Sequence, residues 1–318
     1  MKGNVIKFMF VILSVSLLAL TSCKKSETAA DLTSANDNNN VSQHMNASVD
    51  DASNVAGNSG SLAGKTSSTN AWVLVGATID STQISSGIIK ITYDGTTPVD
   101  GRFTRSGAMT LALQNYPTVH WRDAGATLNM TFTNVKYTNI VTGSQFTYNG
   151  TTEIVNVSGG LAWRILANLD QGTVIHNHKS TGSGVSITFY DGSQRTWNFD
   201  RVRTYTNTGG NISVTLSAGN TLTEGGHSNV DAWGTNRSGT QFYNQIVTPI
   251  VFTNSCNTNY RDPMSGEVKH YVGSSTLDIL FGVDASGNVT TSCPDYGFKI
   301  TYTNARNQVQ TKVVQYWY

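Results

Sequence analysis

The sequence has little charge, little glutamate and few cysteines. Charged residues make up 13% of the 318 residues, about half of the usual quarter. Only four residues are glutamate, which is a strong helix former, so a mostly helical protein is disfavoured. Serine, threonine, asparagine and glycine take their place, and threonine suits the pleated, half-exposed surface of a β-sheet. The composition therefore favours a β-rich protein with a weakly charged surface.

The N-terminus holds an apolar run that is too short to cross a membrane. It covers residues 8–20, whereas a spanning helix needs roughly 20 apolar residues. Lys2 and Lys7 precede the run and small residues follow it, which is the pattern of a secretory signal. The run ends in the tetrapeptide LTSC at residues 20–23, which resembles the bacterial lipobox.

The lipobox resemblance implies that residues 1–22 are removed and that the thiol of Cys23 is diacylated. Cys23 would then be the first mature residue. Acyl chains such as palmitate would hold the protein at a membrane, since each buried CH₂ contributes about 0.8 kcal/mol. The alternative is an ordinary secretory signal with an incidental cysteine.

Removal of the signal leaves 19 of the 21 basic side chains against 20 acidic ones, a formal charge of −1. Nucleic-acid binding usually demands a basic patch, so a nucleic-acid partner is excluded. Of the three cysteines, Cys256 and Cys293 remain to be placed. An exported protein meets an oxidising compartment, so we expect these two to form a disulfide. Two free buried thiols are the alternative.

Residues 24–70 are rich in serine, asparagine, alanine and glycine and poor in large apolar side chains. Such a segment cannot bury enough surface to offset the entropy of ordering it. We therefore expect residues 23–70 to be a lipidated N-terminus and flexible linker. One or two helical turns over residues 45–55 would be marginal.

From residue 71 onward, apolar and hydroxyl side chains alternate, most clearly in residues 128–132, 185–189 and 212–216. A period of two places one face of a strand on a core and the other in water, as in antiparallel sheet. Turn signals separate these runs and indicate hairpins. They lie at residues 190–193, 208–211, 285–288 and 304–307.

Several short motifs are similar to a group of uncharacterised outer-membrane surface lipoproteins of Bacteroidota-type bacteria. The motifs are residues 94–107, 121–132, 249–256, 263–266 and 276–278, together with Cys293. The resemblance covers most of residues 88–303. It implies a β fold, a lipid anchor in the outer membrane, on its cell-surface or periplasmic face, and one structural unit containing Cys256 and Cys293. It implies no activity. Residues 80–82, Asp-Ser-Thr, resemble an O-glycosylation acceptor of this bacterial group.

Candidate chemistry is sparse. His176 and His178 would share one face of a strand and could both reach a metal ion, but neighbouring polar residues also fit a solvated loop. Gly182-Ser183-Gly184 lacks the spacing of a hydrolase nucleophile turn. Most aspartates that could serve a glycosidase lie in turns, where they usually accept backbone N–H groups. We predict no catalytic residue, cofactor or metal site.

The aromatic side chains are the better candidates for binding, because exposed tryptophan and tyrosine are common contact residues. Trp197 alternates with Phe199 and is expected in the core. For the others, structural and contact roles both stay open. The full set is Trp72, Trp121, Trp163, Trp197, Trp233 and Trp317, with Tyr316 and Tyr318 beside the last.

Taken together, these patterns predict an all-β, antiparallel domain of hairpins and meanders over residues 71–318, sandwich-like or built of two sheets. The expected function is that of a non-enzymatic, lipid-anchored envelope protein in binding, adhesion or envelope structure, with a glycan or protein ligand. The alternative is a cell-surface glycan-processing hydrolase or its accessory. A hydrolase should show clustered carboxylates in a cleft, and a binding protein should show an aromatic face.

Overall fold

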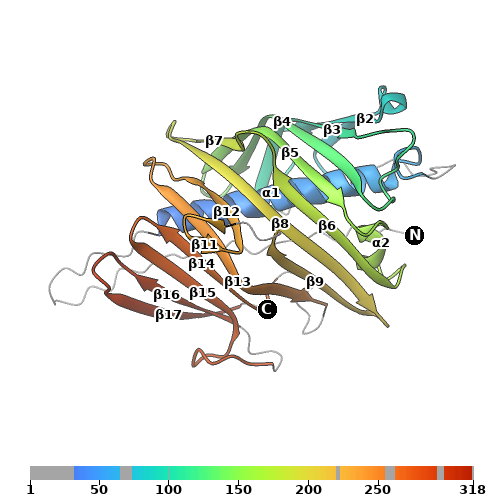
Figure 1. Cartoon of the computed structure of the whole chain (residues 1–318). Helices are drawn as coiled ribbons and strands as arrows, with labels where there is room; N and C mark the ends of the chain where they lie inside the picture. Colours follow the sequence, from blue (N-terminus) through green and yellow to red (C-terminus); the bar gives the residue numbers. More distant parts are fainter. Residues whose placement is uncertain are drawn as a thin grey trace.

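The structure is a computed structural model that describes residues 32–64, 74–99, 101–219, 223–254, 262–291 and 297–316. Within these residues it contains a long helix, a short helix and a large antiparallel sheet (Figure 1). The helices are α1 (Thr33–Asn58) and α2 (Ala162–Leu166), with a short 3-10 helix, η1, at Ile84–Ser86. The strands are β1 (Ala77–Asp80), β2 (Ile88–Asp94), β3 (Phe103–Leu113), β4 (Ala126–Asn139), β5 (Gln145–Asn156), β6 (Gly172–Ser180), β7 (Val185–Phe189), β8 (Gln194–Thr208), β9 (Asn211–Ala218), β10 (Thr223–Glu224), β11 (His227–Ser228), β12 (Val230–Thr235), β13 (Gln241–Thr253), β14 (Ser265–Val272), β15 (Ser275–Val283), β16 (Gly297–Thr303) and β17 (Val309–Gln315).

The strands follow an extended meander. The sheet has 15 strands in the order β1-β2-β3-β4-β5-β6-β8-β12-β13-β14-β15-β16-β17, and β7 and β9 pair beside this path. At two positions in the sheet, two short strands lie between the same pair of longer strands. β6 and β7 both lie between β5 and β8, and β9 and β12 both lie between β8 and β13. A separate hairpin of β10 and β11 completes the structure. Each strand pairing in the described residues is antiparallel, so the predicted fold class is confirmed.

The alternating runs form strands at the predicted places. Residues 185–189 are β7, residues 212–216 lie in β9, and residues 128–132 lie in β4. The four predicted turn signals fall between strands or directly after one. In these turns Asp191 and Asp284 accept backbone N–H groups two residues ahead, at 2.9 Å in both cases, as expected for turn aspartates.

The flexible linker expected over residues 23–70 is wrong for the part that the structure describes. Residues Thr33–Asn58 form a single helix of 26 residues, and only Thr33 of these residues is exposed. An apolar stripe at spacings of three and four residues enters the main core: Val41, Met45, Val49, Ala52 and Ala56. The folded domain therefore includes residues 32–58, which lie before residue 71.

The sheet curves around α1, so that distant strands contact the same helix. The Tyr137 hydroxyl on β4 donates to the carbonyl oxygen of His44, and the Tyr148 hydroxyl on β5 donates to that of Val41. The indole N–H of Trp197 on β8 donates to Asn38 at 3.0 Å. Figure 1 shows α1 running across these strands.

A β-bulge contributes to the curvature. The register between β3 and β4 shifts between Ser106 and Ala108, and Gly107 has a φ of 92°. A Cβ atom at Gly107 would lie 2.1 Å from the carbonyl oxygen of Asn134. Only glycine fits this close approach, and bulges of this kind bend and twist a sheet.

Buried ion pairs hold the helix to the sheet. The Asp50 carboxylate accepts from the Arg203 guanidinium at 2.7 Å, and Asp51 pairs with Arg105. Side chains of this kind are rarely buried unless they are paired. Removing one member of a buried pair costs about 3–5 kcal/mol, because the other charge stays behind without compensation.

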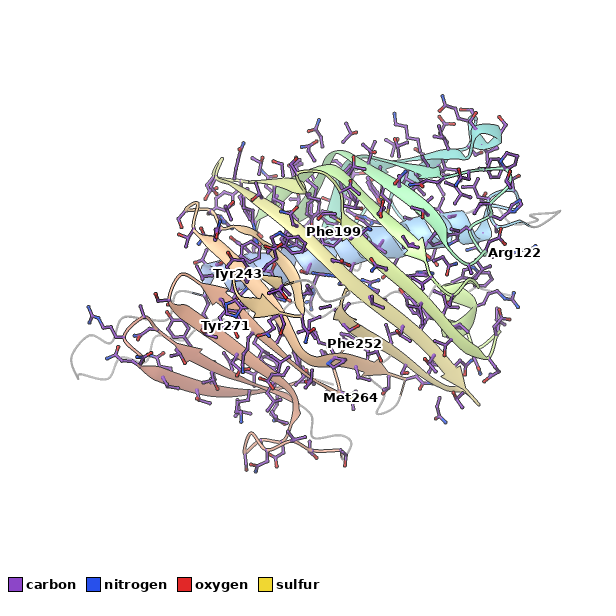
Figure 2. All side chains as sticks on the ribbon, in the orientation of Figure 1. Arg122, Phe199, Tyr243, Phe252, Met264 and Tyr271 are labelled. Carbon is purple, nitrogen blue, oxygen red and sulfur yellow. The ribbon has the colours of Figure 1, made fainter. Side chains whose placement is uncertain are left out.

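The apolar residues gather in three clusters. The main cluster surrounds α1 and includes Phe199 of β8. The second contains Phe252 of β13 with residues of α2, β9 and β14; Phe199 and Phe252 are labelled in Figure 2. In the third, Leu32 packs against β15 and β16.

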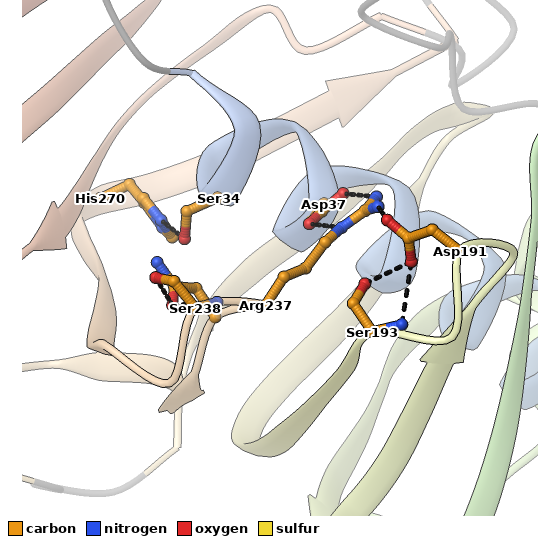
Figure 3. Close-up of polar contacts among 8 residues, drawn as sticks. Ser34, Asp37, Asp191, Ser193, Arg237, Ser238 and His270 are labelled. Atoms are coloured by element: carbon orange, nitrogen blue, oxygen red, sulfur yellow. Dashed lines mark hydrogen bonds and ion pairs between the residues drawn. The ribbon is translucent and has the colours of Figure 1, made fainter.

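The first turns of α1 make the farthest contacts along the chain. Asp37 accepts two hydrogen bonds from Arg237, each of 2.7 Å, and Arg237 also reaches Asp191 at 3.2 Å. The Ser34 hydroxyl lies 3.0 Å from the Nε2 atom of His270 on β14. Figure 3 shows these contacts between the helix, the β7–β8 turn and β14.

We expect Met45→Ala to destabilise the whole domain, because Met45 is fully buried between α1 and the sheet. The expected loss is about 2–5 kcal/mol in the free energy of unfolding, measured by urea denaturation. Asn40→Ala, at a half-buried position of the same helix, is the control and should change stability by about 0.5 kcal/mol or less. Equal stability of both variants would show that α1 is not part of the cooperative fold.

Candidate binding site on the outer face of the sheet

The outer face of the sheet carries three aromatic residues in one row. Trp233 on β12 pairs in register with Tyr243 on β13, and Tyr243 pairs with Tyr271 on β14. Residues directly opposite on neighbouring strands point to the same face, with Cβ atoms about 4.5–5.5 Å apart. We call Trp233, Tyr243 and Tyr271 the aromatic row. Figure 2 shows Tyr243 and Tyr271 on these adjacent strands.

Strand alternation explains why this row faces outward. On β13, Phe242 and Asn244 are buried, whereas Tyr243 between them is half-buried. On β12, Trp233 follows the buried Ala232 and pairs with Asn198 of β8, which also points outward. The row therefore lies on the side of the sheet opposite to α1.

The β10–β11 hairpin covers part of the row. The imidazole of His227 stacks on the ring of Tyr271, with centroids 3.8 Å apart and planes at 15°. Gly225 lies so close to Tyr243 that a Cβ atom there would be 2.3 Å from the ring. Its φ of 56° is also in the left-handed region that favours glycine. Trp233, Tyr243 and Tyr271 are all half-buried, so each keeps part of its surface exposed.

Planar polar groups border the row. The Tyr243 hydroxyl donates to the Gln241 side chain at 2.7 Å, and the Tyr271 hydroxyl donates to the Gln245 side chain at 2.9 Å. Lys269, which pairs in register with Gln245, bonds to Glu267 at 3.0 Å. Aromatic surfaces flanked by amide and charged groups can bind a ligand that is apolar on one face and hydroxylated at its rim.

The other predicted tryptophans have different positions. Trp121 and Trp197 are fully buried, so the core role predicted for Trp197 is confirmed. Trp163 is half-buried and packs against the main cluster. Tyr316 lies against Phe298 in the third cluster. Trp72, Trp317 and Tyr318 lie outside the described residues.

His176 and His178 do share one face of a strand, as predicted, but the solvated-loop interpretation is wrong. Both lie on β6 and are 1% exposed. They face the interior under α1, where the register places His176 opposite Arg203 and His178 opposite Arg201. A guanidinium beside each imidazole repels a metal cation. In the part of the chain that the structure describes, no three histidine, cysteine, aspartate or glutamate side chains gather as a metal site.

The interior shifts the pKa values of its titratable groups. Burial, reinforced by Arg203, lowers the pKa of His176 to about 3 and lowers that of His178 well below its usual value. Burial beside Arg105 lowers the pKa of His44 to about 3. Burial raises the pKa of Asp50 to about 6, because the loss of hydration outweighs the attraction of Arg203.

Several remaining predictions concern residues at the surface or outside the described ranges. Cys23, Cys256 and Cys293 lie outside them, so lipidation and the disulfide stay predictions. Residues 80–82 form an exposed turn in which Asp80 accepts the N–H of Thr82 at 2.9 Å. This exposure leaves the glycosylation prediction open.

No protein-family model, no curated protein and no solved structure matches this chain. Among the helices of the described ranges, none combines the length and apolarity that a membrane span requires. Sequence reasoning singled out Trp233 but missed Tyr243, Tyr271 and His227, since only the strand register brings them together.

We expect His176 to remove stability on acidification from pH 7 to pH 4.5. Burial lowers its pKa to about 3, so between about pH 3 and 6.5 this imidazole binds more protons in the unfolded chain than in the folded one. It removes about 1.4 kcal/mol per pH unit as pH falls through this window. His44, His178 and His270 act in the same direction. Five aspartates act in the opposite direction, because burial raises their folded pKa values: Asp50, Asp51, Asp200, Asp231 and Asp278.

The measurement is the urea midpoint as a function of pH for the wild type and for His176→Asn. The variant lacks this histidine and keeps the other titratable groups. Its free energy of unfolding, relative to that of the wild type, should therefore rise by about 1.4 kcal/mol per pH unit as pH falls below 6.5. A difference between variant and wild type that stays constant from pH 7 to pH 4.5 would contradict the burial of a neutral His176.

Proposed function

We propose that this protein is a lipid-anchored, non-enzymatic protein of the outer membrane that binds a glycan on the outer face of its sheet. The aromatic row is the observation that carries the proposal. It has the form that the binding hypothesis requires, an aromatic face on a rigid sheet. Three aromatic side chains stand side by side at the spacing of strands, about 4.8 Å, which is close to the length of one sugar unit.

A glycan fits this face better than an apolar peptide does. The C–H face of a sugar ring packs on tryptophan or tyrosine, while its hydroxyl groups need planar partners at the rim. Gln241, Gln245 and Lys269 supply such donors and acceptors beside the row. On the Trp233 side, Asn198 and the hydrogen-bonded hydroxyls of Thr196 and Thr235 continue the same polar surface.

The positions of the buried acids support a non-enzymatic role. Asp50, Asp51 and Asp231 are bound to arginines. Asp50 and Asp51 lie on α1 and Asp231 lies on β12, where each ion pair joins elements of the fold. Two carboxylates of the outer face, Glu267 and Asp278, both contact Lys269.

The lipid anchor is tested by metabolic labelling with an alkyne analogue of palmitate. We expect the wild type to be labelled and to enter the detergent phase on Triton X-114 partitioning. Cys23→Ser should lose the label, because the acylated thiol is gone. Cys256→Ser is the matched control and should keep it. An unlabelled wild type, or equal labelling of wild type and Cys23→Ser, would rule out the anchor.

Glycan binding is tested by titration calorimetry with linear oligosaccharides of glucose, xylose, mannose and N-acetylglucosamine. Trp233→Ala should weaken binding about tenfold or more, since a central aromatic contact contributes about 2 kcal/mol. Tyr190→Ala is the control, because Tyr190 is 65% exposed but lies outside the row, and it should bind as the wild type does.

Circular dichroism and urea midpoints of both variants confirm that each is folded before its affinity is compared. Binding of none of the four oligosaccharide series would contradict the glycan assignment. Equal affinities of Trp233→Ala and Tyr190→Ala would show that the aromatic row is not the site.

A further inference from the structure

The inner face of β14–β17 forms an apolar surface beyond the first turn of α1. Leu277, Phe298 and Ile300 are its buried centre, with relative exposures of 7%, 2% and 6%. Around them lie side chains that keep part of their surface exposed. We call the whole set the terminal inner face: Leu277, Ile279, Phe281, Phe298, Ile300, Tyr302, Lys312 and Val314.

Register assigns these residues to one side of the sheet. Leu277 pairs with Tyr302, Ile279 with Ile300, and Phe281 with Phe298. On the edge strand, Lys312 pairs with Ile300 and therefore points to the same side. In an antiparallel pair, directly opposite residues share a face.

The two sides of these strands differ in charge. The outer side carries Glu267, Lys269, Asp278 and Lys299. On the inner side of β14–β17, the described positions include no aspartate or glutamate, and Lys312 is exposed there. The inner side is thus apolar with a basic edge, and the outer side is polar with both signs of charge.

The chain reaches the anchor from this same inner side. Leu32 is 9% exposed and packs in one cluster with Leu277, Phe298 and Ile300. Cys23 lies nine residues earlier, so a fully extended connection spans at most about 30 Å. A lipid on Cys23 would therefore hold the terminal inner face next to the membrane, whereas a linker reaching residue 70 would leave the domain free to move far away.

We propose that the terminal inner face docks on the phospholipid membrane that holds the acyl chains of Cys23. This inference rests on the proposed lipid anchor. Partly exposed Ile279, Phe281 and Val314 supply apolar contact. Tyr302 and Lys312 supply groups that suit the water–lipid boundary, where tyrosine is enriched and lysine extends its charge toward the headgroups.

The docked orientation connects the two proposed surfaces. The aromatic row lies on the opposite side of the same sheet from the terminal inner face, as Tyr271 and His270 are neighbours on β14 that point to opposite sides. With the inner side against lipid, the aromatic row faces away from the membrane. A ligand can then reach the row without passing between protein and bilayer.

Hydroxyl-radical footprinting of the full, acylated protein tests the docking. The protein is reconstituted on vesicles of phosphatidylethanolamine and phosphatidylglycerol, and Cys23→Ser with the same vesicles is the reference. We expect Tyr302 to be oxidised several-fold more slowly in the acylated protein, because lipid covers it. Tyr243 and Tyr271 should be oxidised at equal rates in both, because they face away.

Flotation separates the failure of the docking from that of the anchor. If the acylated protein floats with the vesicles and Tyr302 is oxidised as fast as in Cys23→Ser, the anchor stands and the docking is wrong. If the wild type is not acylated and does not float, the proposed anchor fails and the docking inference fails with it.

A matched pair of charge variants on the edge strand identifies the face. Lys312→Glu and Thr311→Glu both change exposed neighbours on β17, the first pointing inward and the second outward. We expect Lys312→Glu to restore Tyr302 oxidation toward the rate of Cys23→Ser while the protein still floats, because a carboxylate is repelled by anionic headgroups. Thr311→Glu should keep the protection. Equal protection in both variants would overturn the proposed orientation.

Discussion

The fold depends on the pairing of carboxylates on α1 with arginines of the sheet and of one of its turns. Asp37, Asp50 and Asp51 each meet a guanidinium from a different strand or turn. A charge that is buried without a partner is so costly that the helix has one register and one rotation against the sheet. The strands must in turn curve far enough to bring their arginines to it. Helix position and sheet curvature are thus fixed by the same contacts.

The interior and the outer face of the sheet differ in the residue types that they carry. Most of the described histidines and four of the arginines lie in the interior, where they hold α1 or pack beneath it. The outer face carries hydroxyl, amide and a few aromatic side chains, with charged side chains of both signs on β14–β16. Binding through this face needs no movement of the helix, because the aromatic row stands on strands whose inner sides are already packed.

Much of the sheet could be predicted because apolar and polar residues alternate along a half-buried strand, as they do in residues 185–189. The helix could not be predicted in the same way. A surface helix is normally recognised by a continuous stripe of apolar residues, and in α1 serines, asparagines and aspartates occupy part of the buried face. The arginine partners of Asp50 and Asp37 lie more than 150 positions away. The stripe of Val41, Met45 and Val49 was the one readable signal. The aromatic row required a register between strands that a single sequence does not contain.

The helix also imposes an order of events on folding. Most strands pair with a neighbour in the chain, so the sheet can grow hairpin by hairpin as synthesis proceeds. The residues of α1 are synthesised before the strands that they contact. Asp37 and Arg237 are 200 positions apart in the sequence, and Ser34 and His270 are 236 positions apart. Contacts of such separation form late and slowly. Until these contacts form, residues 33–58 lack the sheet surface against which they pack in the folded protein. During synthesis they are therefore accessible to chaperones and proteases for longer than the strands are.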